Sequence, residues 1–389
     1  MRLNLFSLAP NSFILGSLEL LQQFYPKKVF DIPWITKNQT TSDTLGNVVS
    51  SDNNTWGVEI HLTSRCPLRC VRCSYGKRNR DGSELSPEVV ARFLRSIDRF
   101  NVGSVIFSGG GDPLAWKGGK FVDCLVENVR YKRAIATNGL GLMKTMNQND
   151  LKSLDIVQIN ISGYSEDSYL RTTRTHLFKN FVKNIQWLFN HREAHITQVT
   201  GKIVIDNKNY KEIGKYLEFC AQMPFDLVVI KLAGNFESGQ DVALKEDQKK
   251  ELRSLMYQSP VLKQYPGLLD AIATDDNSVE LDLPTKCWVV EYNLYMLIRS
   301  NGDIFPCVTS PYCRENRIGN LYESDISEIW ANPMHHKIKH KLNEDMRCLR
   351  CNLDVCRHMR YNLLLEETVD SSRYINLLPE TKKVRPKLL

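Results

Sequence analysis

Short apolar segments alternate with helical segments through the middle of this 389-residue chain. The apolar segments are rich in Val and Ile, which favours β-strands, and between them apolar residues recur every three or four positions, which favours helices. Strands that alternate with helices predict a parallel sheet, because a parallel connection needs a crossover and a helix supplies it. We therefore expect an α/β fold, either an open parallel sheet or a partial barrel, and of these a partial (β/α)6 barrel of the TIM type is the fold we predict. Its strands are expected at 58–62, 104–107, 133–137, 156–161, 196–205 and 227–232, and its helices at 87–100, 121–131, 148–154, 178–189 and 210–222.

The composition is that of a folded, soluble protein. Hydrophobic residues make up 42% and charged residues 24% of the chain, which is ordinary for globular domains. No segment approaches the ~20 uninterrupted apolar residues that cross a bilayer, and polar residues interrupt the apolar N-terminal run at 13–21, which makes it a poor signal peptide. The net charge of +7 is spread along the chain, so neither nucleic acid nor a membrane is predicted as a partner. We expect a cytoplasmic protein.

The cysteines indicate where the chemistry lies. Eleven cysteines in a cytoplasmic chain favour metal or redox use over disulfides. Three of them, Cys66, Cys70 and Cys73, form a C-x3-C-x2-C loop after the first predicted strand, at the end of the strand where such barrels bind ligands. Iron–sulfur cubanes are normally held by four thiolates, so a loop with three would leave one iron open to a substrate. A zinc knuckle or a cysteine-rich surface turn is the alternative interpretation.

Small and polar residues follow the next three predicted strands. After the second strand, Gly109, Gly110 and Gly111 precede Asp112, and consecutive glycines let the backbone turn tightly and offer main-chain groups to a polar ligand. The third strand ends in Thr-Asn-Gly and the fourth is followed by Ser-Gly. Turn chemistry explains each segment singly, but their recurrence at one rim of the sheet favours a bound small molecule.

A second group of cysteines lies in the last third of the chain. Cys287 and Cys307 come first, Cys348 and Cys351 form a C-x2-C pair, and Cys356 follows. Two distant cysteines and a C-x2-C pair supply four thiolates. Such a set suits either zinc or a fully ligated iron–sulfur cluster, and the spacing does not choose between them.

These patterns resemble the radical S-adenosylmethionine (SAM) superfamily. Its motif is C-x3-C-x-aromatic-C, followed by a Gly-Gly-Glu-Pro-like turn after the second strand, and the resemblance covers about residues 56–235. Two positions depart from the motif, because Arg72 stands in the aromatic position and Asp112 replaces the usual Glu. The later cysteines, with the spacing C-x14-G-x4-C from Cys287 to Cys307, resemble the C-terminal SPASM/Twitch-type auxiliary iron–sulfur domain of many such enzymes.

The resemblance implies a ligand set for each cofactor. Cys66, Cys70 and Cys73 would hold a [4Fe–4S] cluster, and its fourth iron would chelate the amino and carboxylate groups of SAM. The residues implied around SAM are Gly109, Gly110 and Gly111 at the amino group, Asp112 beside them, Tyr75 in place of the missing aromatic residue, and Asn138 and Ser162 for the rest of the cofactor. One auxiliary [4Fe–4S] cluster is implied at Cys287, Cys307, Cys348 and Cys351, with Cys356 or Cys313 in an alternative ligand set and zinc as the alternative metal.

The resemblance also implies an oxidoreductase or peptide-modifying activity. A reduced flavodoxin or ferredoxin-type donor would supply an electron, SAM would be cleaved to methionine and a 5′-deoxyadenosyl radical, and that radical would take a hydrogen atom from an unactivated carbon. The leading substrate is a ribosomally made peptide that undergoes crosslinking, oxidation or epimerisation. The alternatives are a dehydrogenase or epimerase of a sugar or aminocyclitol, and a non-catalytic iron–sulfur electron carrier or zinc-binding scaffold. Cys313 could donate a hydrogen atom to the substrate radical, serve as a ligand, or do neither.

Five segments are expected along the chain. Residues 1–55 form an N-terminal extension and linker, which looks short for the winged-helix leader-binding domain that some peptide-modifying members carry. Residues 56–250 form the radical SAM partial barrel, and 251–280 connect it to the smaller cysteine-rich auxiliary-cluster domain at 281–362. The last segment, 363–389, is a C-terminal tail.

Overall fold

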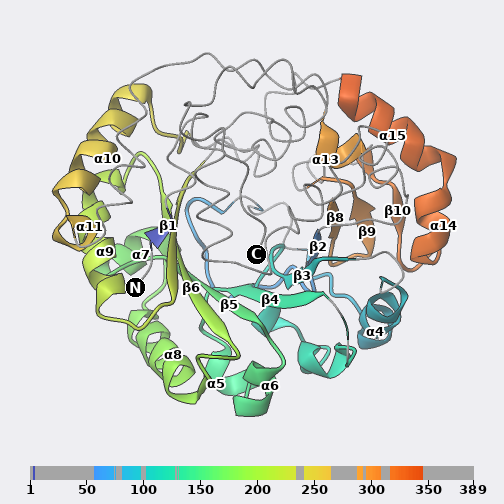
Figure 1. Cartoon of the computed structure of the whole chain (residues 1–389), viewed down its shortest axis with the longest axis horizontal. Helices are drawn as coiled ribbons and strands as arrows, with labels where there is room; N and C mark the ends of the chain where they lie inside the picture. The colour runs from blue at the N-terminus through green and yellow to red at the C-terminus, as the bar shows by residue number, and fades with distance from the viewer. Residues whose placement is uncertain are drawn as a thin grey trace, which may run out of the picture.

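A computed structural model gives the fold of the chain (Figure 1). It describes residues 3–4, 57–73, 75, 81–97, 102–127, 129, 131–233, 241–263, 287–291, 295–307 and 316–344. Cys313, Cys348, Cys351, Cys356 and the tail at 363–389 lie outside the described residues. Within the described ranges, no helix has the length and apolar character needed to cross a membrane.

Six parallel strands form the centre of the sheet, as the alternation of strands and helices predicts. They are β2 (Gly57–Ile60), β3 (Ser104–Phe107), β4 (Lys132–Thr137), β5 (Ile156–Ile161), β6 (Gln198–Ile205) and β7 (Leu227–Leu232). Each strand pairs in parallel with the next one along the chain. The sheet curves, and helices cover its outer face (Figure 1). The partial α/β barrel expected from the sequence is therefore confirmed.

The sheet continues beyond both ends of this parallel core. β1 (Leu3–Asn4) pairs in parallel with β7, and β8 (Tyr295–Ile298) pairs in parallel with β2. β9 (Asp303–Phe305) pairs antiparallel with β8, and β10 (Gly319–Asn320) pairs antiparallel with β9. The strand order is β1-β7-β6-β5-β4-β3-β2-β8-β9-β10, so the barrel is open. Strand β8 thus joins the C-terminal part of the chain directly to the strand that leads into the cysteine loop.

The first helix on the outer face begins where the sequence predicts. Ser86 precedes α4 (Pro87–Ser96), and its Oγ accepts a hydrogen bond from the backbone N–H of Val89 at 3.3 Å. The serine cap satisfies one of the unpaired donors of the first turn, and proline at the first helical position has no N–H to leave unpaired. The other α-helices among the described residues are α5 (Leu142–Thr145), α6 (Gln148–Lys152), α7 (Glu166–Thr173), α8 (Phe178–His191), α9 (Ile213–Ala221), α10 (Glu246–Gln258), α11 (Pro260–Lys263), α13 (Trp288–Glu291), α14 (Ile326–Ala331) and α15 (Pro333–Glu344). The 3-10 helices are η4 (Pro113–Ala115), η5 (Phe121–Cys124) and η6 (Tyr210–Glu212).

The helix expected at 121–131 is wrong. Among the described residues of this segment only the 3-10 turn η5 forms. Val122, Val126 and Val129 are β-branched, and such side chains lose rotamer freedom in a helix. The apolar residues whose spacing predicts a helix here instead belong to a short connection between β3 and β4.

Alternate residues of each strand face opposite sides of the sheet. In β6, Val199 and Ile203 are completely buried and belong to the hydrophobic core under the helices. In β2, Val58 and Ile60 do the same. Glu59, between them, therefore lies on the inner face, where it is also buried.

The registers bring the carboxyl ends of the strands to one edge of the sheet. Ile60 at the end of β2 pairs with Phe107 at the end of β3, and Thr137 at the end of β4 pairs with Ile159 in β5. The loops that leave β2, β3 and β4 therefore start side by side. The three site segments expected from the sequence lie in these loops.

Candidate functional site

The cysteine loop follows β2 in the chain and contacts helix α7. Cys66, Cys70 and Cys73 are half-buried along it. The backbone N–H groups of Arg69 and Val71 donate to carbonyls in the last turn of α7, at 3.0 and 2.9 Å. These bonds fix the middle of the loop, and with it the thiol positions at the rim of the sheet.

The glycine turn packs directly against the base of the cysteine loop. The Gly111 N–H donates to the Thr63 carbonyl at 2.8 Å, and the Asp112 N–H donates to the Arg65 carbonyl at 2.7 Å. A Cβ atom on Gly111 would lie 1.9 Å from the Arg65 carbonyl oxygen. Because no side chain fits in that space, backbone contact with the loop requires glycine at this position.

The first two glycines of the turn are required for a reason that differs from the one at Gly111. Gly109 and Gly110 have φ angles of 25° and 68°, a region that favours glycine. A Cβ on Gly109 would also lie 2.3 Å from Nε2 of His61, a residue of the segment that follows β2. The three consecutive glycines therefore let the turn approach both the side chains and the backbone of the neighbouring loop.

Asp112 fastens the glycine turn to the end of β4. Its buried carboxylate accepts hydrogen bonds from the Thr137 hydroxyl at 2.9 Å, the Asn138 N–H at 2.7 Å and the Leu114 N–H at 3.0 Å. Burial raises the pKa of the Asp112 carboxyl above its ordinary value, and the hydrogen bonds oppose that shift. The carboxylate thus links the loops that follow β3 and β4.

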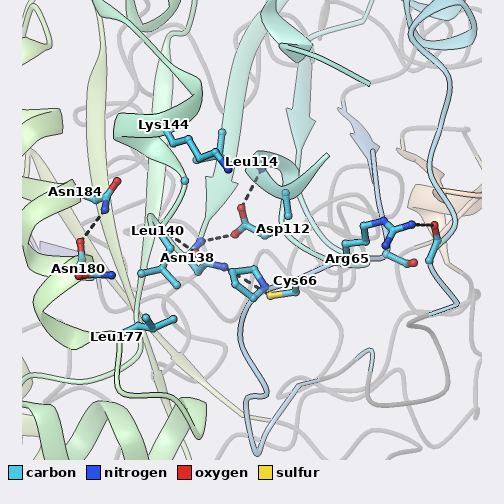
Figure 2. Close-up of a pocket in the computed structure, with 15 residues that line it drawn as sticks. Arg65, Cys66, Asp112, Leu114, Asn138, Leu140, Lys144, Leu177, Asn180 and Asn184 are labelled. Carbon is cyan, nitrogen blue, oxygen red and sulfur yellow. Dashed lines mark hydrogen bonds between the residues drawn. The ribbon is translucent and has the colours of Figure 1, made fainter. Parts of the chain in front are cut away.

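A cavity of about 680 Å³ opens beside the first cysteine (Figure 2). Cys66, Asp112 and Asn138 line it together. The Asn138 Nδ2 group donates to Cys66 Sγ at 3.6 Å, and its Oδ1 accepts from the Leu140 N–H at 2.9 Å. The fold therefore brings predicted residues from the loops after β2, β3 and β4 into one cavity.

Ser162 stands apart from this group. It is half-buried directly after β5, three strands from β2 in the sheet order. The residues that line the cavity do not include it. Its predicted role at SAM stays a prediction.

Tyr75 contacts a buried polar network that the sequence analysis missed. Its hydroxyl lies 3.1 Å from Nε2 of His61, and the same nitrogen lies 3.1 Å from Oε1 of Glu59. The Glu59 carboxylate also accepts hydrogen bonds from the hydroxyls of Ser108 and Tyr295. The signal for this network in the sequence is the alternation Val-Glu-Ile-His-Leu, in which two charged or polar residues interrupt a buried strand.

The described part of the second cysteine group holds two of its members. Cys287 is half-buried just before α13, and Cys307 is buried just after β9. Gly302 in the intervening turn has a φ of 87°, and a Cβ there would lie 2.6 Å from the Tyr322 ring. The glycine between these two cysteines is thus required by the turn. The remaining predicted ligands lie outside the described residues.

Two family models match the chain. The model of the radical SAM superfamily matches residues 60–220, and SPASM, an iron–sulfur cluster-binding domain, matches residues 287–352. The first covers the strands and loops of the cysteine site, and the second covers Cys287 and Cys307. This protein belongs to the radical SAM superfamily. Within it, the protein is an enzyme that carries a C-terminal SPASM domain.

The curated relatives share only part of their length with this chain. The probable GTP 3′,8-cyclase of Methanocella arvoryzae is 27% identical over 213 residues, which are 54% of this chain and 66% of the relative. The probable GTP 3′,8-cyclase of Methanosarcina acetivorans is 30% identical over 173 residues, which are 42% of this chain and 50% of the relative. The chain therefore spans between half and about two thirds of these relatives.

Solved structures share the fold over most of the chain. The crystal structure of Streptococcus suis SuiB bound to S-adenosylmethionine has a TM-score of 0.59 and 17% identity, and covers 90% of this chain and 87% of SuiB. SuiB bound to the precursor peptide SuiA gives a TM-score of 0.57 at 17% identity, over 92% and 89% of the two chains. Native anSMEcpe with bound AdoMet gives 0.53 at 16% identity, over 83% and 98%. At these identities the likeness shows the fold alone.

The family matches confirm the cofactors expected from the sequence, namely a [4Fe–4S] cluster with SAM and an auxiliary iron–sulfur cluster. The described residues fit the first of these. Three half-buried cysteines share one loop, and the Asn138 amide donates toward the sulfur of Cys66. In the described ranges, no three His, Cys, Asp or Glu side chains converge closely enough to bind a single metal ion. A cubane cluster does not need such convergence, because each of its three thiolates binds a different iron.

Substitution of Gly111 by alanine tests the contact between the turn and the loop. We expect the free energy of unfolding to fall by about 1–3 kcal/mol, because the new Cβ overlaps a backbone carbonyl that cannot move without the loop. We also expect SAM to bind more weakly to the anaerobically reconstituted protein. Urea denaturation and equilibrium SAM binding measure the two effects.

Gly214→Ala is the matched control. A Cβ at Gly214 in α9 would meet no heavy atom within 4 Å beyond its neighbouring residues and the backbone of its own helix, so this variant should gain about 0.5–1 kcal/mol of stability and bind SAM as wild type does. A Gly111→Ala protein as stable as wild type, with unchanged SAM affinity, would contradict the required contact.

Proposed function

We propose that Cys66, Cys70 and Cys73 hold the SAM-binding cluster and that this site generates the radical that starts the reaction. When bound, the cluster and SAM supply reductive cleavage to methionine and a 5′-deoxyadenosyl radical, which takes a hydrogen atom from an unactivated carbon of the substrate. The observation that carries the proposal is the placement of the three-cysteine loop against the glycine turn in a radical SAM enzyme.

The chain's own residues orient SAM in this proposal. Gly109, Gly110 and Gly111 present main-chain groups without side chains to its amino group, and Asp112 keeps that turn tied to β4. Asn138 lines the cavity beside Cys66 and donates toward its sulfur. Tyr75 and Ser162 are proposed for the adenine and the rest of the cofactor. The bond from Asn138 to Cys66 matters because an N–H group that donates to a thiolate stabilises its negative charge.

Exclusion of water is the second task of this site. Leu114, Leu140 and Leu177 line the cavity with Cys66 (Figure 2). Polar residues such as Lys144, Asn180 and Asn184 line other parts of the cavity, so the apolar part of its wall would lower the local dielectric constant and keep solvent from reactive species. The arrangement of the leucines supports a site that protects a radical.

For the auxiliary cluster we propose Cys287, Cys307, Cys348 and Cys351 as ligands, with Cys356 or Cys313 in an alternative set. This cluster would accept an electron from the product radical, which suits oxidation or crosslinking. If Cys313 instead donates a hydrogen atom to the substrate radical, the outcome is epimerisation. We assign the SAM site to a partial barrel at 56–250 and the auxiliary cluster to a domain at 281–362, with 251–280 between them.

A ribosomally made peptide is the substrate we propose. The support is the likeness in fold to SuiB, which has been crystallised with its precursor peptide SuiA, and to anSMEcpe, which has been crystallised with a peptide. Both likenesses extend over more than four fifths of this chain. The proposed reaction is crosslinking, oxidation or epimerisation of that peptide.

A small molecule is the second candidate substrate. The curated relatives named GTP 3′,8-cyclase, which match about half of this chain, act by name on a nucleotide. Dehydrogenation of a sugar or aminocyclitol needs the same radical and the same auxiliary electron acceptor, whereas epimerisation needs the same radical and a hydrogen-atom donor. In either case the proposed electron donor is a reduced flavodoxin or ferredoxin, which supports a cytoplasmic location.

Formation of 5′-deoxyadenosine tests the activity. The anaerobically reconstituted, reduced wild-type protein should form it from SAM, and the variant Cys66→Ala, Cys70→Ala, Cys73→Ala should form none, because it lacks the ligands of the SAM-binding cluster. Liquid chromatography with mass detection measures the product.

Cys124→Ala is the matched control for the cysteine variant, since Cys124 is buried in the core away from the loop. It should retain the wild-type rate. A wild-type protein with a verified cluster that forms no 5′-deoxyadenosine would contradict the proposed activity, and would leave an electron carrier or a scaffold as its function.

Mass spectrometry of candidate substrates after anaerobic turnover separates the reaction types. Oxidation removes two hydrogen atoms, epimerisation leaves the mass unchanged in water but takes up deuterium from heavy water, and crosslinking joins two residues of one peptide. We expect a precursor peptide to show one of these changes. A sugar or aminocyclitol that changes while peptides do not would replace the peptide by the second candidate.

A further inference from the structure

Arg72 makes a buried ion pair that the motif of the family does not predict. It stands in the aromatic position directly before Cys73. Its Nη1 donates to Oδ2 of Asp206 at 2.6 Å, and the two side chains are only 7% and 4% exposed. The pair joins the cysteine loop to the end of β6, 134 positions away in the chain.

Asp206 is a rigid anchor for this pair. It follows the last residue of β6, and its Oδ1 accepts hydrogen bonds from the N–H groups of Lys208 and Asn209, both at 2.9 Å. The Asp206 N–H in turn donates to Oδ1 of Asn209 at 2.7 Å. One carboxylate oxygen is thus occupied by its own turn and the other by Arg72, so the position of the carboxylate is fixed.

The ion pair supplies the second attachment of the cysteine loop. Arg69 and Val71 tie the loop to α7 through backbone hydrogen bonds, and Arg72 ties the following residue to β6 through its side chain. Exposed ion pairs contribute little to stability. A buried pair is different, because loss of one partner leaves the other charge uncompensated inside the protein.

We propose that Arg72 and Asp206 are positioning residues for the SAM-binding cluster. Their ion pair holds the Cys70–Cys73 half of the loop against β6 and keeps one cation and one anion at fixed places beside the cluster. The proposal rests on the proposed ligand role of the three cysteines.

Charge distinguishes this role from simple reinforcement of the fold. Reduction adds a negative charge to the cluster, and a nearby cation favours that charge while a nearby anion opposes it. Arg72→Met leaves the anion alone, so the cluster should become harder to reduce. Asp206→Asn leaves the cation alone, so the cluster should become easier to reduce. Loss of packing by itself gives no reason for the two variants to shift the reduction potential of the cluster in opposite directions.

The chain provides a matched control pair at the other edge of the sheet. Arg192, whose side chain is 6% exposed, pairs with Asp226, which is 33% exposed and directly precedes β7. This pair lies at the amino ends of the strands, whereas the cysteine loop lies at their carboxyl ends. Asp226→Asn removes the same kind of bond and should leave the cluster unchanged.

The experiment uses the full-length protein, reconstituted anaerobically. Redox titration followed by electron paramagnetic resonance gives the midpoint potential of the cluster whose signal changes when SAM is added, and iron analysis reports whether that cluster is present. We expect a lower potential in Arg72→Met, a higher one in Asp206→Asn, and a value between them in the double variant. Arg72→Lys keeps the charge and should stay near the wild type, as should Asp226→Asn.

Loss of the SAM-responsive cluster from Arg72→Met and Asp206→Asn, with retention in Arg72→Lys and Asp226→Asn, would support the attachment of the loop. Unchanged potentials in both single variants, or shifts in the same direction, would overturn the proposal. Equal loss of the cluster from Asp226→Asn would overturn it too. A wild-type protein without a SAM-responsive cluster would refute the proposed function itself, and so is distinct from all these outcomes.

Discussion

The backbone contact between the glycine turn and the cysteine loop is the constraint on which the rest of the site depends. Two hydrogen bonds join the turn to the carbonyls of Thr63 and Arg65, and the space at Gly111 excludes even a methyl group. This contact sets the distance between the cysteines and the main-chain groups that face SAM in our account. Neighbouring parallel strands make it possible, because their loops leave the same edge of the sheet.

Buried charged side chains then hold the loops around that contact in place through hydrogen bonds and an ion pair. Asp112 ties the glycine turn to β4, and Arg72 ties the cysteine loop to Asp206 after β6. On the inner face, Glu59 and His61 connect β2 to Tyr75 and to the C-terminal strand β8 through Tyr295. The radical SAM barrel and the SPASM part of the chain therefore share one polar network behind the cysteine loop. This network and the pairing of β8 with β2 together connect the two cluster-binding parts.

Sequence alone predicts the features that local pattern encodes. The Val- and Ile-rich runs predict the six central strands, and the spacing of Cys66, Cys70 and Cys73 predicts the site. Each of these patterns is formed by residues that are close together in the sequence. The Arg72–Asp206 pair and the pairing of β8 with β2 escape this reasoning, since each joins segments more than a hundred residues apart. The helix expected at 121–131 fails for a related reason, as tertiary packing overrides an apolar spacing that looks helical.

We propose that the three-cysteine loop leaves one iron of its cluster open to SAM. Electron–nuclear double resonance on the reduced, anaerobically reconstituted protein tests it directly, with SAM whose methionyl carboxylate carries a magnetic oxygen isotope. We predict a hyperfine coupling between that oxygen and the cluster, which disappears in the variant that lacks Cys66, Cys70 and Cys73. A reduced cluster that binds SAM without any such coupling would contradict the account.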